Sequence, residues 1–291
     1  MSDNEGLLYE SLMNDLLFHM VFSKNNAALR GLVSSLLNLQ ESELQEITVL
    51  NPMQYTDAFD SKLTVLDLRA HLNGDRYLNI EMQVRRFSWW ANRSLIYSCR
   101  QIVEQSNAED FSYEKLEPVI HVAIMNHTLF RDHRRFFTKY ALADREGYPY
   151  SDALQFYVMD LTAVAGATEA EKQQGLVEWA NAFTAKDWEQ VQQIDNPAVK
   201  EAVKQMRTIM STPSERDIIW SRKLAEIDYR SQAAYERSEG RAEGIGIGRA
   251  EGRAEVARRM VAMGMSPADV SRFTGLSEAE VGQFGSYGNP Q

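Results

Sequence analysis

The chain has 291 residues, of which 44% are apolar, so it is long enough for one large domain or for a core domain with an appendage. Its formal net charge of −10, taken over the whole chain, argues against a general attraction to nucleic acid. The polar N-terminus gives no sign of a secretory signal and no apolar run is long enough to cross a bilayer, so we expect a cytoplasmic chain that enters no membrane.

The first part of the chain predicts two short helices followed by a strand. The helical patterns cover residues 11–22 and 26–38, with a break at Asn25 and Asn26. Residues 44–50 have the composition of a strand and end at an Asn-Pro pair that stops it.

Two runs of alternating polarity, 65–72 and 77–84, predict an antiparallel hairpin in which each strand has one apolar and one polar face. The apolar faces coincide only in some registers, because a slip of one residue turns every side chain to the other face. A two-residue Asn-Gly turn gives the wrong register, so we predict a longer loop or a bulge that pairs Leu72 with Arg76.

This register places acidic side chains on the polar face of the hairpin. It sets Asp67 opposite Glu81 and Val65 opposite Gln83, with cross-strand Cβ atoms roughly 5 Å apart. Two carboxylates at that separation can share one hard divalent cation through oxygen, and without a cation one of them is pushed toward protonation. On the residues alone, an ordinary hairpin with charged side chains on a solvated face is an open alternative.

The remaining elements complete an α/β pattern. Residues 87–105 are predicted to be helical, and the apolar runs 118–126 and 154–161 predict buried strands. From Thr168 to about residue 260 the pattern is helical. Helices before, within and after a sheet indicate an α/β core followed by a helical extension.

Basic residues are concentrated around the hairpin although the whole chain is acidic. No acidic residue occurs from Val84 to Val103, a segment that contains four arginines and two tryptophans. A second basic cluster follows further along the chain, and its members are Arg131, His133, Arg134, Arg135 and Lys139.

The tail repeats glycine every four residues from Gly240 to Gly252, in step with glutamate and alanine. Each glycine inside a helix costs about 1 kcal/mol relative to alanine, so a flexible linker is one interpretation. We favour a helix that self-associates, because a stripe of glycines forms a groove in which another helix can approach closely.

Two short helices are predicted after this repeat. Gly264 ends the long helix, Ser266 and Pro267 begin the next, and Ser277 caps the last. The pair resembles a helix-turn-helix, but two glutamates and no base-reading cation lie on its second helix, which phosphate repels. We therefore predict an oligomerisation or protein-contact module here, with DNA reading as the alternative.

The hairpin sequence VLDLRAHLNGDRYLNIEMQV resembles the core of the PD-(D/E)xK nuclease superfamily. Within it, the chain is most similar to the Rpn family of recombination-promoting nucleases or transposases, whose signature is Asp followed by Ile-Glu-x-Gln. The similarity continues in NDLLFHMVFSKN (14–25), NRSLIYSCRQ (92–101) and YEKLEPVIHVAIMNHTLF (113–130), and in the tail segment MGMSPADVSRFTGLSEAEV.

The resemblance implies a restriction-endonuclease-like α/β core, with a central mixed sheet flanked by helices, and an α-helical C-terminal extension. We expect the nuclease core at residues 1–165 and a helical extension at 166–238. Residues 239–291 then hold the Glu-Gly repeat helix and the small helix-turn-helix-like module.

The same resemblance implies catalytic roles for three hairpin residues. Asp67 and Glu81 are expected to be metal ligands, and Asp15 on the first helix to be a third, outer ligand. Gln83 stands where the wider superfamily has lysine, and it can only donate and accept hydrogen bonds. Lys62 is a candidate for supplying the missing charge.

Nucleic-acid-binding residues are expected beside this site. Arg93 and Tyr97 match the family's Arg-x-x-x-Tyr helix, and their spacing of four puts them on one face, where they could hold a phosphate. Arg85 and Arg86 follow the second hairpin strand and are expected to add to this binding.

The activity that the resemblance implies is that of an endodeoxyribonuclease with low sequence specificity, in a recombination, mobile-element or phage-defence context. Its cofactor would be Mg²⁺, with Mn²⁺ or Ca²⁺ as other candidates, and its partners DNA and further copies of itself in a homodimer or higher oligomer. The alternative is a catalytically inactive module that keeps the fold and binds nucleic acid or protein, because Gln83 and the acidic total charge leave it open.

Overall fold

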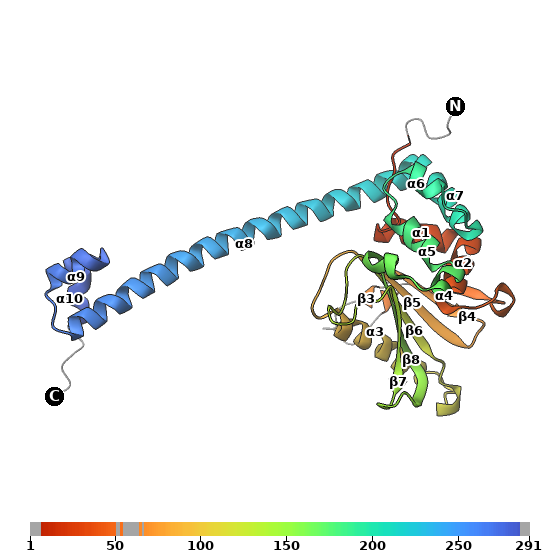
Figure 1. The fold of residues 1–291 in the computed structure, drawn as a ribbon, viewed down its shortest axis with the longest axis horizontal. Coiled ribbons are helices and arrows are strands. Elements are labelled where there is room, and N and C mark those ends of the chain that lie inside the picture. The colour runs from red at the N-terminus through yellow and green to blue at the C-terminus, as the bar shows by residue number, and fades with distance from the viewer. Residues whose placement is uncertain (1–6, 51–52, 55–63, 66, 286–291) are drawn as a thin grey trace. The chain divides into compact units, whose positions relative to one another are not determined.

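The computed structural model of the chain describes residues 7–50, 53–54, 64–65 and 67–285 (Figure 1). Its contacts divide the chain into two compact units, Met1–Ile219 and Trp220–Gln291, which we describe separately. None of the described helices is both long and apolar enough to cross a membrane.

A mixed six-stranded sheet forms the centre of the first unit, in the order β1-β4-β5-β6-β8-β7. Strands β5, β6 and β8 are mutually parallel, and the outer pairs are antiparallel. The strands are β1 (Ile47–Leu50), β4 (Leu68–Leu72), β5 (Arg76–Gln83), β6 (Val119–Met125), β7 (Phe137–Ala143) and β8 (Pro149–Asp160). The predicted mixed sheet is thus confirmed, although β7 was not anticipated.

A separate two-stranded sheet precedes β4. It joins β2 (Met53–Gln54) to β3 (Thr64–Val65), and Val65 pairs with Met53. The prediction that Val65 lies opposite Gln83 in one continuous hairpin is therefore wrong, because β3 pairs with another partner before the chain enters β4.

Helices that precede the sheet in the sequence and helices that follow it lie together (Figure 1). They share one hydrophobic core with the apolar face of the sheet. Its largest buried side chains include Phe18, Phe22, Trp179 and Phe183. The helices are α1 (Asp15–Lys24), α2 (Asn26–Leu37), α4 (Glu169–Gln173), α5 (Leu176–Thr184), α6 (Trp188–Gln192) and α7 (Pro197–Ser211), with short 3-10 turns η1 (Glu41–Glu43), η2 (Tyr113–Lys115) and η3 (Leu161–Gly166). The predicted break between the first two helices is confirmed at Asn25, which ends α1 and caps α2.

Helix α3 (Trp90–Gln105) packs near β6 and β8 and carries buried Ser94, Ser98 and Gln101. Asn79 on β5 donates from Nδ2 to Oε1 of Gln101 at 2.6 Å. Asn79 is 0% and Glu81 1% exposed. The polar face of the hairpin is therefore buried, not solvated, at Asn79 and Glu81, where polar groups need partners within the protein.

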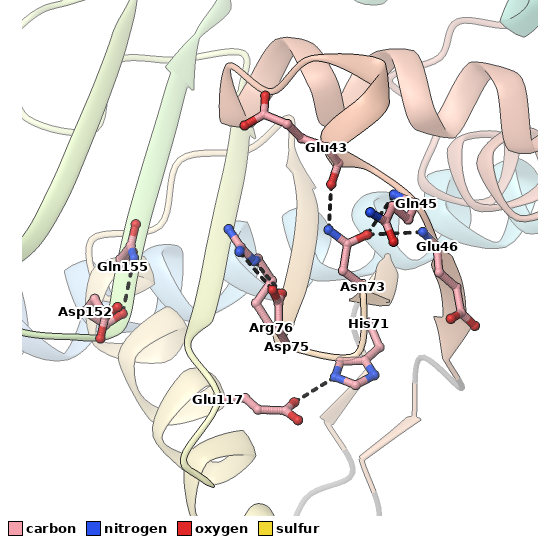
Figure 2. A network of polar contacts seen from close by, with 10 residues as sticks. All are labelled: Glu43, Gln45, Glu46, His71, Asn73, Asp75, Arg76, Glu117, Asp152 and Gln155. Atoms are coloured by element: carbon pink, nitrogen blue, oxygen red, sulfur yellow. Dashed lines mark hydrogen bonds and ion pairs between the residues drawn. The ribbon is translucent and has the colours of Figure 1, made fainter. Parts of the chain in front are cut away.

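The turn of the hairpin explains its register (Figure 2). Asn73 and Gly74 both have positive φ, and the Asp75 N–H donates to the Leu72 carbonyl at 3.0 Å. Leu72 nevertheless pairs with Arg76, so Asp75 is the extra residue of a bulge. The predicted longer loop or bulge is confirmed.

Asn73 also ties this turn to the segment before β1 (Figure 2). Its Oδ1 accepts from the N–H groups of Gln45 and Glu46 at 2.9 and 3.1 Å, and its Nδ2 donates to the Glu43 carbonyl at 2.6 Å. These bonds use both ends of the amide, so they hold the left-handed residue in place and fix the register that the carboxylates need.

The second unit contains most of α8 (Pro213–Ala262), followed by α9 (Pro267–Thr274) and α10 (Glu278–Gly285). Helix α8 continues through the glycine repeat, which agrees with the helical interpretation and not with a flexible linker. Ala257, Val270 and Val281 form a small core between the three helices. Ser266 caps α9 as predicted, and Gly264 and Gly275 adopt positive φ at the two turns.

Candidate active site

Asp67 and Glu81, which we call the carboxylate pair, lie at one end of the antiparallel ladder between β4 and β5. The observed register runs from Leu72 opposite Arg76 to Leu68 opposite Ile80. Asp67 is the next residue beyond Leu68, so the same register carries it to the position opposite Glu81. Its Oδ2 accepts a hydrogen bond from the Met82 N–H at 2.6 Å, which holds the carboxylate against β5.

The environment of Asp67 disfavours its negative charge. The pKa of Asp67 is raised from 3.8 to about 7, mainly by burial and to a smaller extent by the negative charges of Glu81 and Asp15. The hydrogen bond from Met82 and the positive charge of Arg93 act in the opposite direction and lower this pKa. In the absence of a cation, Asp67 is therefore protonated over much of the acidic range.

Burial also disfavours the negative charge of Glu81, which is less exposed than Asp67. Burial raises its pKa, and the Arg93 guanidinium, the nearby Trp90 indole and a hydrogen bond from Gln83 partly oppose this rise. Gln83 donates from Nε2 to Oε2 of Glu81 at 3.2 Å. The other oxygen, Oε1, is buried, and no donor among the described residues meets it in ordinary hydrogen-bonding geometry.

Arg93 lies close to this oxygen. A guanidinium nitrogen of Arg93 lies 3.7 Å from Glu81 Oε1, beyond hydrogen-bonding distance but close enough for electrostatic attraction. The Tyr97 ring, four residues further along α3, lies with its centroid 4.9 Å from the guanidinium carbon. The structure therefore brings Arg93 and Tyr97 together as predicted and places them beside Glu81.

Helix α1 supplies two side chains from another part of the sequence. Asp15 lies in its first turn, where Oδ1 accepts from the Leu16 N–H at 2.7 Å, and it is close enough to raise the pKa of Asp67. His19, one turn later, donates from Nδ1 to the main-chain carbonyl of Asp67 at 2.8 Å. His19 was not among the predicted site residues, although its spacing of four from Asp15 was a usable signal.

Arg86 is not among the charges that shift the pKa values of the carboxylate pair. Arg85 and Arg86 follow the last residue of β5, and Arg86 is exposed. The charge of Arg86 acts on His127 in the segment after β6 and not on the carboxylates. Lys62, the other predicted source of positive charge, lies outside the described residues.

Two known protein families match segments of this chain. The family described as PD-(D/E)XK nuclease family transposase matches residues 12–236, which is well over half of the chain. This chain belongs to that family. A second family, the C-terminal HTH domain of the Rpn/YhgA-like nucleases, matches residues 250–284. No curated protein and no solved structure matches the chain.

The two matches confirm the resemblance inferred from the sequence. This PD-(D/E)XK chain has the mixed sheet and flanking helices expected of such a core, followed by a helical region that includes the helix-turn-helix. The two family matches support a nuclease or transposase-related role for the chain.

PD-(D/E)XK nucleases typically use divalent metal ions, and the carboxylate pair of this family member fits such an ion chemically. Two carboxylates whose pKa values are raised by desolvation, with one Glu81 oxygen that lacks a hydrogen bond, form an all-oxygen donor set that a hard cation favours. Within the described ranges, no three His, Cys, Asp or Glu side chains converge as a metal-binding group. Asp15 as a third ligand therefore stays a prediction.

Proposed function

We propose that this chain is a divalent-metal-dependent endodeoxyribonuclease in which Asp67 and Glu81 are the metal ligands. The observation that carries the proposal is the carboxylate pair itself, whose buried charges repel each other and are each held at a raised pKa. A bound Mg²⁺, with Mn²⁺ or Ca²⁺ as other candidates, would lower the pKa of a water molecule and offset negative charge on the phosphate. Low sequence specificity and a recombination, mobile-element or phage-defence context are parts of the same proposal.

The remaining side chains have distinct roles in this scheme. Gln83 holds the Glu81 carboxylate through its amide N–H. His19 and the Met82 N–H position Asp67 through its carbonyl and its carboxylate, respectively. Arg93 supplies a positive charge 3.7 Å from Glu81 and, backed by Tyr97, is placed to attract a phosphate oxygen.

A non-catalytic binding module is the second candidate, because Gln83 carries no charge and the whole chain has a net charge of −10. Supercoiled plasmid incubated with Mg²⁺ or Mn²⁺ distinguishes the two functions. The nuclease proposal expects nicked and linear products that disappear in EDTA and in the Asp67→Ala variant. Equal nicking by wild type and variant, or none with any divalent metal, favours the binding module.

Replacing Gln83 tests whether its hydrogen bond to Glu81 contributes to the reaction. We expect Gln83→Leu to lower the cleavage rate by about 10-fold to 100-fold, because a hydrogen bond that orients a metal ligand has effects of that size. Gln83→Glu should lower it at least as much by adding a third negative charge. Initial rates at saturating Mg²⁺ measure this effect, and a Gln83→Leu rate equal to wild type would contradict the role.

We also propose that the chain forms a homodimer or higher oligomer through α8. A side chain added at Gly244 or Gly248 meets nothing within 4 Å, so these positions are free for a partner helix. Light scattering should give at least twice the 33.2 kDa chain mass for wild type and the monomer mass for Gly244→Leu with Gly248→Leu. Gly246→Leu, off the four-residue stripe, is the matched control, and a monomeric wild type would refute the proposal.

A further inference from the structure

Two basic segments that are distant in sequence meet at one edge of the sheet. Strands β5, β6 and β8 are parallel, so their carboxyl ends lie together and the chain leaves β5 into residues 84–89 and β6 into residues 126–136. The Asn126 N–H donates to the Gln83 carbonyl at 3.0 Å, which joins the starts of the two segments.

A shared hydrophobic cluster keeps the two segments side by side. Phe87 from the first segment and Leu129 from the second both pack against the cluster of Trp90, Ala123, Met125 and Val158. The proximity of the segments is therefore a property of the folded core and not of a flexible loop.

The second segment is also held along its length. The rings of Phe130 and His133 both lie against Tyr140 of β7, with centroids 6.1 and 6.4 Å away. Arg134 donates to the Thr162 carbonyl, which follows β8, at 2.6 Å. A segment anchored in this way loses little conformational freedom when it binds a ligand.

Four arginines on these segments expose their positive charge to solvent. Arg86, Arg131, Arg134 and Arg135, which we call the arginine surface, are exposed, and no carboxylate among the described residues forms a salt bridge with them. Asp132 is the one acidic residue within the two segments.

Lys139, which belongs to the same basic cluster in the sequence, does not belong to this surface. Its ammonium group lies 4.7 Å from the ring centroid of Tyr157 and 5.8 Å from that of Phe137. Both rings belong to the main hydrophobic core, on the opposite face of the sheet from the Trp90 cluster. The structure therefore separates the cluster into an arginine surface and one lysine that packs on aromatic rings.

We propose that the arginine surface binds the phosphate backbone of duplex DNA beside the carboxylate pair. Arg86 lies five residues after Glu81, a path of at most roughly 17 Å at the rise of an extended chain. Duplex DNA carries one charge per roughly 1.7 Å of its axis. Several phosphates on either side of a phosphodiester bond placed at the carboxylate pair therefore fall within reach of these guanidinium groups. The identity of this ligand rests on the proposed function.

Salt-dependent binding of the full chain tests this surface. A fluorescent 20-base-pair duplex is titrated in EDTA, where no metal-dependent cleavage occurs, at a series of KCl concentrations. We expect the triple variant Arg131→Ala, Arg134→Ala and Arg135→Ala to bind at least 10-fold more weakly, and its slope of log Kd against log[KCl] to fall by about 2 to 3, or about 0.9 per lost phosphate contact. Arg131→Ala alone, which removes no hydrogen bond to the protein, should lower the slope by about 1.

Arg145→Ala is the matched control. Arg145 is exposed in the turn between β7 and β8, at the end of β7 opposite to the arginine surface, and its removal should leave the slope unchanged. An unchanged slope in the triple variant, a wild type that does not bind duplex DNA, or preferential binding of RNA would overturn the inference. Failure of the proposed function looks different, because the slope would then fall as expected while wild type cleaves no DNA with any divalent metal.

Discussion

Glu81→Gln and Asp67→Asn are each expected to lower metal-dependent cleavage of plasmid DNA by about 10³-fold. A metal ion contributes several kcal/mol of charge stabilisation in the transition state, and each 1.36 kcal/mol corresponds to a factor of ten in rate. Both substitutions keep the size and shape of the side chain but remove the charge that holds the cation. Initial rates of plasmid nicking at saturating Mg²⁺ measure the loss.

Matched substitutions separate this effect from a general loss of charge. Glu146→Gln and Asp152→Asn change exposed carboxylates elsewhere in the same unit and should retain the wild-type rate. The thermal unfolding of the two active-site variants should be unchanged or occur at higher temperature, because each replaces a buried carboxylate with a neutral amide. Cleavage by Glu81→Gln within a factor of ten of wild type would contradict its assignment as a ligand.

Without metal, Asp67→Asn is expected to stabilise the protein increasingly as the pH rises from 4 to 8. The pKa of Asp67 is about 7 in the folded protein and 3.8 in its ordinary state. As the pH rises, the unfolded chain therefore loses the Asp67 proton at a lower pH than the folded protein does. The stability that wild type has below pH 3.8 is therefore lost as the pH rises toward 7. We expect the difference in unfolding free energy between variant and wild type to grow by roughly 3 kcal/mol over this range.

The informative quantity is the difference in unfolding free energy between wild type and Asp67→Asn, and not the pH profile of either protein alone. Burial lowers the pKa of His121 from 6.5 to about 3, so the folded protein keeps this imidazole neutral. Its effect on the unfolding free energy is a loss of stability as the pH falls below 6.5, which is opposite in direction to the effect of Asp67. His121 is present in both proteins and cancels in the comparison.

Urea unfolding in EDTA at pH 4, 6 and 8 measures the difference, with Asp152→Asn as the control that should show none. Saturating Mg²⁺ at pH 8 should reduce the advantage of the variant, because the cation binds the ionised wild-type pair. A difference that is independent of pH would show that Asp67 ionises normally in the folded protein.

Alternation in the sequence was enough to predict the hairpin and its register. The side chains of a strand repeat every two residues, so the requirement that both apolar faces meet excluded a simple two-residue turn and brought Asp67 and Glu81 together. Buried apolar runs likewise located β6 and β8. These features depend only on local order along the chain.

Elements with weak local patterns were missed or misjudged. Strand β7 begins next to a basic cluster and lies at the edge of the sheet, where one side is unpaired and most residues are exposed, so it has no continuous apolar run. The covering of the polar hairpin face by α3 was also not predicted. Ser94, Ser98 and Gln101 give no hydrophobic signal, although all three are buried.

Contacts between distant segments could not be predicted from a single sequence. The bond between His19 and Asp67 joins residues 48 positions apart. The arginine surface depends on parallel strands that bring two separate segments to one edge, and Lys139 leaves that surface only because of the face of β7 on which it lies.

Isothermal titration of Mn²⁺ into the metal-free protein at pH 8 tests the central claim most directly, because it depends on the carboxylate pair and not on the choice of DNA substrate. We expect saturable binding by wild type that is lost in Asp67→Asn and in Glu81→Gln, and that is retained in Asp152→Asn. Equal uptake of Mn²⁺ by wild type and by the double variant Asp67→Asn with Glu81→Gln would contradict a metal site at these two residues.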